Sequence, residues 1–144
     1  MELNQFTDYS LRTLIFAALR SEESELVSVK EIAAAFDISE NHLVKVVHSL
    51  AKLGYLDTFR GRSGGIQLAR PPAEIGVGEL VRAVEPLAVV ECIPPRKGTC
   101  CIKGICELQS ALGRATQAFL AELDQLTLAD LVKNDDELKS QLQA

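Results

Sequence analysis

The 144-residue sequence lacks a long apolar run. Its longest apolar stretch near the N-terminus, Leu14–Leu19, is far shorter than the roughly 18 residues that suggest a transmembrane helix. No basic segment leads into an apolar run after Met1, so we expect no signal peptide, no membrane contact and a cytoplasmic protein. The content of 47% hydrophobic and 24% charged residues is typical of globular chains and excludes wholesale disorder.

The sequence also lacks an excess of positive charge, since its net charge is −5. Residues 39–70 are nevertheless locally basic, and they contain both histidines of the chain. That segment holds five basic residues (Lys45, Lys52, Arg60, Arg62 and Arg70) and two acidic ones (Glu40 and Asp57). An acidic protein can still bind nucleic acid when its positive groups gather on one face.

Hydrophobic spacing predicts three helices in the first part of the chain. Apolar residues recur at helical spacing over residues 11–19, and again from Val29 to Phe36 after a capping box formed by Ser28 and Glu31. A third helix is predicted to run to about Leu53, where Gly54 suits the position after a helix end. The short break between the second and third helices is typical of a helix-turn-helix.

The next segment predicts a β-hairpin, with strand-like residues over 55–60, a glycine-rich turn over 61–65 and an alternating strand over 66–70. Further along, the spacing predicts a short helix over 77–84, a long amphipathic helix over 108–126, a helical turn over 127–132 and a fraying tail. The predicted fold is therefore mainly α with a small β-hairpin. It is a winged helix-turn-helix (1–72), a central loop with a long C-terminal dimerisation helix (73–132) and a polar tail (133–144), intertwined in one domain.

The third helix and the hairpin carry the candidate DNA-binding residues. In a recognition helix, residues at the N-terminal end reach base edges in the major groove while lysines meet phosphates. A glycine-rich hairpin tip can approach a groove closely enough for a flanking arginine to enter it. The candidates are Ser39, Asn41, His42, Lys45, His48, Arg60, Arg62, Gly64 and Gly65. The alternative interpretation is a solvated helix face beside a flexible turn.

Four cysteines, Cys92, Cys100, Cys101 and Cys106, lie within 15 residues of one another. Their spacing is not that of a CxxC…CxxC zinc ribbon, and no histidine lies nearby to complete a zinc site. In a reducing compartment such a group favours metal ligation or redox chemistry, and thiolates are the usual ligands of iron–sulfur clusters. A thiol oxidoreductase using Cys100 and Cys106 is the remaining alternative, but CxxC and βαβ patterns are both lacking, so we expect no enzyme.

Several segments resemble one family of winged-helix regulators, which includes the iron–sulfur regulator IscR and the nitric-oxide-sensing repressor NsrR. The similar segments are Phe6–Arg12, Ile38–Lys45 and Arg60–Ile66. Leu87–Cys92, Phe119–Asp124 and Thr127–Val132 are most similar to the NsrR branch. The resemblance extends over about residues 1–132. It implies a nitric-oxide-sensitive repressor that binds double-stranded operator DNA as a homodimer.

The resemblance also implies one [4Fe–4S] cluster per subunit, or a [2Fe–2S] cluster as the alternative. Its ligands would be Cys92, Cys100, Cys106 and Asp8 of the partner subunit. Two departures matter: the gap before Cys100 is longer than usual, which leaves Cys101 as an alternative ligand, and Gln109 replaces the histidine ligand of the IscR type. From the residues alone, Asp8 is an acid that favours a helix dipole. The alternative function is a cofactor-free or thiol-redox-responsive regulator.

The ligand assignment predicts distinct effects of single cysteine substitutions. Cys92→Ala, Cys100→Ala and Cys106→Ala are each expected to abolish cluster assembly, because each removes one thiolate ligand. Cys101→Ala is expected to retain the cluster. Iron and sulfide content with the visible spectrum of anaerobically purified variants measures this. Loss of the cluster in the Cys101 variant, with retention in the Cys100 variant, would move the ligand by one residue.

Overall fold

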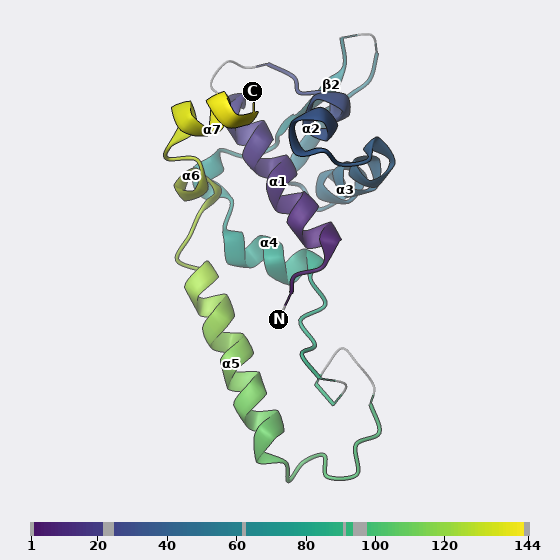
Figure 1. Ribbon diagram of the computed structural model, residues 1–144, viewed down its shortest axis with the longest axis vertical. Helices are drawn as coiled ribbons and strands as arrows, with labels where there is room; N and C mark the ends of the chain where they lie inside the picture. The colour runs from purple at the N-terminus through teal and green to yellow at the C-terminus, as the bar shows by residue number, and fades with distance from the viewer. Residues whose placement is uncertain (1, 22–24, 62, 91, 94–97, 143–144) are drawn as a thin grey trace.

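Helix α1 (Gln5–Leu19) lies at the centre of the fold, where it contacts α2, α3, α4, α6, α7 and β2 (Figure 1). This computed structural model describes residues 2–21, 25–61, 63–90, 92–93 and 98–142. The helix begins six residues before the predicted start because Asn4 caps it by accepting a hydrogen bond from the Thr7 amide at 2.8 Å. Its buried hydroxyls at Ser10 and Thr13 donate to backbone carbonyls of the preceding turn. Because these buried residues are polar, the apolar spacing in the sequence does not indicate the first turns of the helix.

The helix-turn-helix forms as the sequence predicts. Helix α2 (Val29–Phe36) begins with the capping box, in which Glu31 also accepts from the Ser28 amide at 2.8 Å. These bonds to Ser28 hold the pKa of the Glu31 carboxyl below its usual range. Asp37 turns the chain in the left-handed region (φ 53°) and α3 (Glu40–Lys52) follows, burying Leu43, Val46, Val47 and Leu50. Gly54 (φ 79°) then ends the helix as expected.

The wing is an antiparallel hairpin of β1 (Leu56–Phe59) and β2 (Gly65–Leu68), in register from Leu56 opposite Leu68 to Phe59 opposite Gly65. Val27 extends the sheet by an isolated antiparallel β-bridge, in which Val27 and Ile66 exchange backbone hydrogen bonds of 2.9 and 2.8 Å. Ile66 is buried while most of β1 faces solvent. The hairpin is therefore attached to the domain mainly through β2, while most of β1 faces solvent.

The chain after the wing returns to the core. A 3-10 turn η2 (Pro72–Glu74) leads to α4 (Val77–Val84), and α5 (Glu107–Leu123) is followed by α6 (Leu128–Leu131). Backbone bonds from the Val77 amide to Leu126 and from the Leu128 amide to Ile75 join these segments. The long helix ends at Leu123, three residues before the predicted boundary. Beyond it, the Asp124 carboxylate binds Arg82 of α4, and the Leu126 carbonyl accepts a hydrogen bond from the Val77 amide.

The prediction of a fraying tail is wrong for the residues that the structure describes. Residues Asp135–Leu142 form helix α7, which contacts α1, and Leu142 packs against the core (Figure 1). An ion pair between Lys139 and Asp135, one turn apart at 3.4 Å, spans the helix. The tail is polar in composition, yet Leu142 at the end of the helix packs against the core and docks it.

The fold class predicted from the sequence, mainly helical with one hairpin, is confirmed. Figure 1 shows α5 and the loop before it extending away from the body formed by the other elements. Among the described residues, no helix combines the length and the apolar character needed to cross a membrane.

The core contact of α6 predicts a large effect of truncating Leu128, which is 2% exposed and packs with Ile75 and Leu80. Leu128→Ala is expected to lower the free energy of unfolding by about 2–5 kcal/mol, because it leaves a cavity in the shared core. Denaturant unfolding measures this, with Val44→Ala on the solvent side of α3 as the control. Equal effects of the two substitutions would place α6 outside the cooperative core.

Candidate DNA-binding surface and cysteine loop

The outer face of α3 presents the polar residues that the sequence singles out. Ser39, Asn41, His42, Lys45 and His48 are all exposed, on the side opposite the buried Leu43 and Leu50. Ser39 makes no side-chain cap bond to the helix, so its hydroxyl remains available at the helix N-terminus. The face thus combines hydrogen-bonding side chains with the positive end of a helix dipole, a combination that suits base edges and phosphates.

Two further residues join this face that the sequence analysis did not assign. The Tyr9 ring of α1 lies 6.4 Å from the His42 ring, between centroids, at an interplanar angle of 30°. Val44 is exposed between the polar residues, where it offers an apolar contact of the kind that thymine methyl groups accept. The sequence pattern did not assign either residue to this face, because an exposed Val and a half-buried Tyr look like core residues in an apolar pattern.

The wing supplies a second exposed cation, Arg60, beside the exposed ring of Phe59. A Cβ on Gly64 would overlap the Phe59 carbonyl oxygen, and one on Gly65 would lie 2.8 Å from the Val27 carbonyl oxygen. The two glycines therefore permit the close backbone approach that shapes the hairpin. Arg62, also predicted to bind DNA, lies outside the described residues.

The cations on this surface are available for phosphates. Within the part of the chain that the structure describes, Lys45, Lys52 and Arg60 take part in no ion pair. Arg70, by contrast, pairs with Glu79 of α4 at 3.4 Å and so contributes less to the basic surface than its position in the sequence suggests.

The cysteines lie on the loop that precedes α5, at the end of that helix far from the body (Figure 1). Cys106 occupies the N-cap position of α5. The Gln109 amide donates to the Cys92 carbonyl oxygen at 3.2 Å and so ties the start of the loop to α5. Cys92, Cys100 and Cys106 are half-buried, whereas Cys101 is exposed.

The chemistry of these donors fits an iron–sulfur cluster, since soft thiolates are its usual ligands. A cavity of about 430 Å³ adjoins Cys106 and is lined also by Ile93, Gly104 and Gln109. Among the described residues of the single chain, however, no three Cys, His, Asp or Glu side chains are placed to hold a metal ion. The loop provides suitable donors that are not yet gathered around one centre.

Asp8 lies beside the helix-turn-helix rather than beside the cysteines. Its carboxylate pairs with Arg12 at 3.0 Å, and the Arg12 guanidinium lies 5.6 Å from the centre of the Phe36 ring. Phe36 is the last residue of α2, directly before the Asp37 turn. A groove of about 580 Å³ runs along Asp8, Tyr9 and Arg12 on one side and Phe36, Asp37 and Ile38 on the other.

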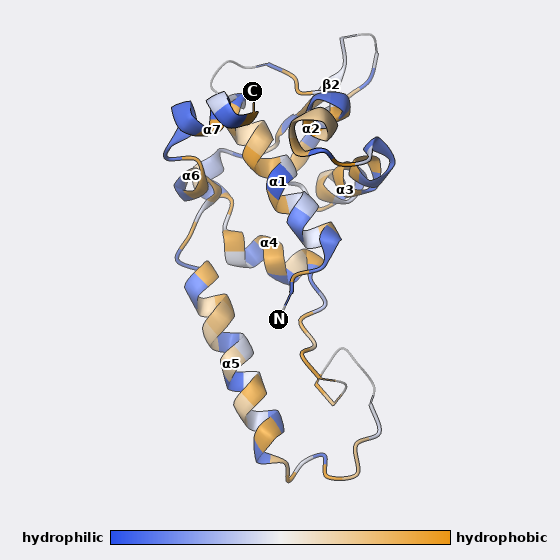
Figure 2. Ribbon diagram, viewed as in Figure 1, coloured by the Kyte–Doolittle hydropathy of each residue, from blue (hydrophilic) through white to orange (hydrophobic). Residues whose placement is uncertain are grey.

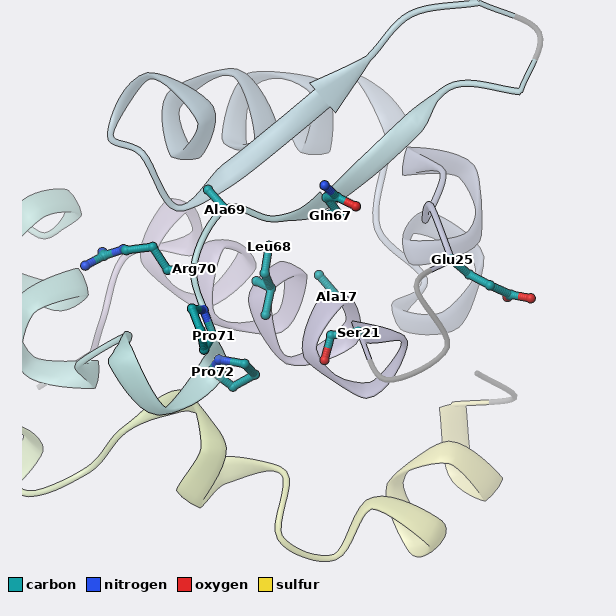
Figure 3. Close-up of a pocket in the computed structure, with 9 residues that line it drawn as sticks. All are labelled: Ala17, Ser21, Glu25, Gln67, Leu68, Ala69, Arg70, Pro71 and Pro72. Atoms are coloured by element: carbon teal, nitrogen blue, oxygen red, sulfur yellow. The ribbon is translucent and has the colours of Figure 1, made fainter.

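A separate cavity of about 370 Å³ lies at the base of the wing (Figure 3). It is lined by Ala17 and Ser21 of α1, by Glu25 and by residues 67–72. The Ser21 hydroxyl already donates to the Ala18 carbonyl at 2.7 Å, and Figure 3 shows Arg70 extending away from the other lining residues. The cavity therefore gathers no group of reactive side chains.

Comparison with known proteins gives consistent matches over nearly the full chain. Residues 3–134 match the Rrf2 family, described as an iron-dependent transcriptional regulator. The chain is 46% identical over 143 residues to the "HTH-type transcriptional regulator NsrR" of Bacillus licheniformis, covering 99% of both chains. It is 48% identical to the protein of the same name from Geobacillus kaustophilus, covering 99% of this chain and 97% of that one.

Solved structures show the same architecture. The cysteine regulator CymR of Bacillus subtilis has a TM-score of 0.72 and 28% identity, covering 93% of this chain and 98% of that chain. IscR of T. potens has a TM-score of 0.72 and 26% identity, covering 95% and 90%. The resemblance that the sequence analysis found on separate motifs is thereby confirmed over the whole fold.

The wing geometry predicts that its arginines contribute to DNA affinity. Replacing Arg60 and Arg62 together with Ala is expected to weaken operator binding by about 1–3 kcal/mol, because groove contacts of arginine have this magnitude. Titration at fixed salt concentration measures the change. Lys133→Ala is the control, because Lys133 is an exposed cation outside the candidate DNA-binding surface. Unchanged affinity of the double variant would remove the wing from the interface.

Proposed function

Because the chain belongs to the Rrf2 family of transcriptional regulators, we propose that it is a nitric-oxide-sensitive repressor that binds operator DNA as a homodimer. An iron–sulfur cluster would serve as its sensor. The observation that carries this proposal is the joint placement of a cysteine loop at the start of α5 and of Asp8 at the helix-turn-helix. Nitric oxide as the signal comes from the similarity to proteins named NsrR.

Binding to DNA is supported by the exposed face of α3 and by the free cations of the surface. In a two-fold dimer, two such helices would read half-sites about one helical turn, roughly 34 Å, apart. The operator would then be a dyad-symmetric double-stranded site. The contacts from Lys45 and Arg60 to phosphates would make its affinity depend strongly on salt.

Dimerisation is supported by the apolar surface of the projecting helix. Figure 2 shows hydrophobic residues recurring along α5. In this helix, all of which the structure describes, only Leu120 is buried, and Leu108 is 64% exposed. Ile105, immediately before the helix, is 82% exposed. A stripe of this kind is costly in water, and a second copy of α5 would cover it.

The cluster would be held by Cys92, Cys100 and Cys106, with Cys101 as the alternative to Cys100. The fourth ligand would be Asp8 of the partner subunit, because α1 of a second copy can bring its own carboxylate to the loop. The groove beside Asp8 provides room for such a loop. We propose a [4Fe–4S] cluster, and a [2Fe–2S] cluster would use the same ligand set. When bound, the cluster would supply iron that nitric oxide can attack.

Asp8 would then act as a tether between sensor and DNA-binding unit. A carboxylate binds soft iron more weakly than a thiolate does, so Asp8 would be the most weakly held ligand of the cluster. A released Asp8 can pair with Arg12, which packs on Phe36 next to the helix-turn-helix. Loss of the tether would in this way change the spacing of the two recognition helices. A change of 1.4 kcal/mol is tenfold in affinity, so a modest movement suffices.

A second candidate function is repression controlled by thiol oxidation without a cluster. The observation that favours it is the exposed Cys101, next to the half-buried Cys100. The visible spectrum of anaerobically purified protein separates the two candidates. A cluster gives broad visible absorption, whereas a thiol switch is colourless.

The tether predicts a specific effect of Asp8→Ala. The cluster is expected to be retained with water or a thiol in the vacant position, while operator affinity falls or loses its response to nitric oxide. Anaerobic measurement of iron content and of operator binding, before and after nitric oxide, tests this. Asp136→Ala on α7 is the control, since it removes an exposed carboxylate from a helix without cluster residues. Wild-type affinity together with a wild-type nitric oxide response in the Asp8 variant would refute the tether.

A further inference from the structure

Three side chains meet at the base of the wing, and they come from both ends of the hairpin and from α4. Tyr55 precedes β1, Arg70 follows β2 and Glu79 lies in the first turn of α4. The Tyr55 hydroxyl donates to Glu79 Oε1 at 3.1 Å, and Arg70 Nη2 lies 3.4 Å from the same oxygen. The Arg70 guanidinium also stacks over the Tyr55 ring, 5.0 Å from its centre. We call these residues the wing-base cluster.

The wing-base cluster lies where the hairpin is attached to the domain. The Ala69 amide donates to the Tyr55 carbonyl at 3.0 Å and closes the hairpin beside the cluster. Each strand is only four residues long, and a two-stranded hairpin is marginally stable by itself. The direction of the wing therefore depends on how its base is held, and Glu79 is the acceptor shared by both of its ends.

Burial makes the acceptor at Glu79 important. Tyr55 is 2% exposed, and a buried hydroxyl without a partner carries a desolvation penalty. Burial, together with the neighbouring Glu79 carboxylate, raises the pKa of Tyr55 to about 12. Arg70, which closes the other side of the cluster, is engaged by Glu79. Figure 3 shows its side chain extending away from the other labelled residues.

The same short helix also holds α5. One turn after Glu79, Arg82 binds the Asp124 carboxylate with two nitrogens, and Arg82 Nη2 lies 2.6 Å from Asp124 Oδ2. Gly78 lies beside this pair, where a Cβ would overlap the Asp124 carboxylate. Helix α4 therefore connects the wing base on one side to the end of the long helix on the other.

We propose that Glu79 is a positioning residue for DNA binding: it fixes Tyr55 and Arg70 to α4 and so directs the wing, with Arg60, toward the operator. This inference rests on the part of the proposed function in which the wing contacts DNA. It is independent of the cluster and of nitric oxide. Glu79 itself does not contact DNA, so its effect passes entirely through the orientation of the wing.

The test is a double-mutant cycle between Glu79 and Arg60, measured as operator affinity of the full-length protein. Glu79→Ala is expected to weaken binding by about tenfold, the size of a lost groove contact. Arg60→Ala is expected to have a much smaller effect in the Glu79→Ala background than in the wild-type protein, because a misdirected wing no longer delivers Arg60. A cycle with additive effects, or wild-type affinity of Glu79→Ala, would overturn the proposal.

Conservative variants separate positioning from a general loss of stability. Glu79→Gln keeps the acceptor oxygen and is expected to bind within about twofold of wild type, well inside the tenfold loss that one groove contact represents. Tyr55→Phe removes only the hydroxyl and is expected to reproduce part of the Glu79→Ala loss. Glu74→Ala is the matched control, since its carboxylate takes part in no ion pair among the described residues. Equal weakening by Glu79→Gln and Glu79→Ala would contradict the role of the acceptor.

A spectroscopic titration checks that the contact exists in solution. Tyr9 and Tyr55 are the two tyrosines of the chain, so a Tyr9→Phe background leaves one phenol to titrate. Its pKa is expected near 12 and is expected to fall in Glu79→Gln, because the neighbouring negative charge is removed. An unchanged pKa would overturn the contact. Iron content and the nitric oxide response, recorded on the same proteins, report separately on the proposed function.

Discussion

The burial of α1 is the constraint on which the rest of the structure depends. Leu14 and Leu19 are fully buried together with the hydroxyls of Ser10 and Thr13, so this helix must be enclosed on nearly all sides. The helix-turn-helix, the wing, α4, α6 and α7 all contact it. The N-terminal end of α1, where Asp8 and Tyr9 lie, is therefore packed next to the helix-turn-helix.

The cysteine loop and α5, in contrast to α1, are not enclosed by the rest of the chain. They extend away from the core, and Leu108 and Ile105 remain exposed, so their final arrangement requires a further surface to pack against. Under the proposed function, the core would be the DNA-binding unit, and the projecting segment would be a sensor whose donors are completed by a second copy of the chain. Helix α4 lies between the two parts, since it holds the wing through Glu79 and α5 through Arg82.

Local signals in the sequence were sufficient where local chemistry sets the structure. The capping box at Ser28, the left-handed glycine at Gly54 and the alternating strand ending in Leu68 each fix the backbone within a few residues. The resemblance on the motifs around Asp8, His42 and Gly64 identified the family before the fold was known. The start of α1 and the helix α7 were not predicted, because buried hydroxyls replace apolar residues in α1 and because α7 has only two leucines among polar residues.

The sequence by itself thus determined the helix-turn-helix, the hairpin after it, the polar outer face of α3 and the group of cysteines in one loop, since each depends on residue type and spacing along one segment. Only the tertiary structure decided which distant residues meet. It placed Tyr9 against His42, Asp8 and Arg12 beside Phe36, and Arg70 on Glu79 and Tyr55 instead of on the DNA-binding surface. The physical reason is that packing around α1 brings together side chains far apart in the chain, and no local pattern specifies such pairs.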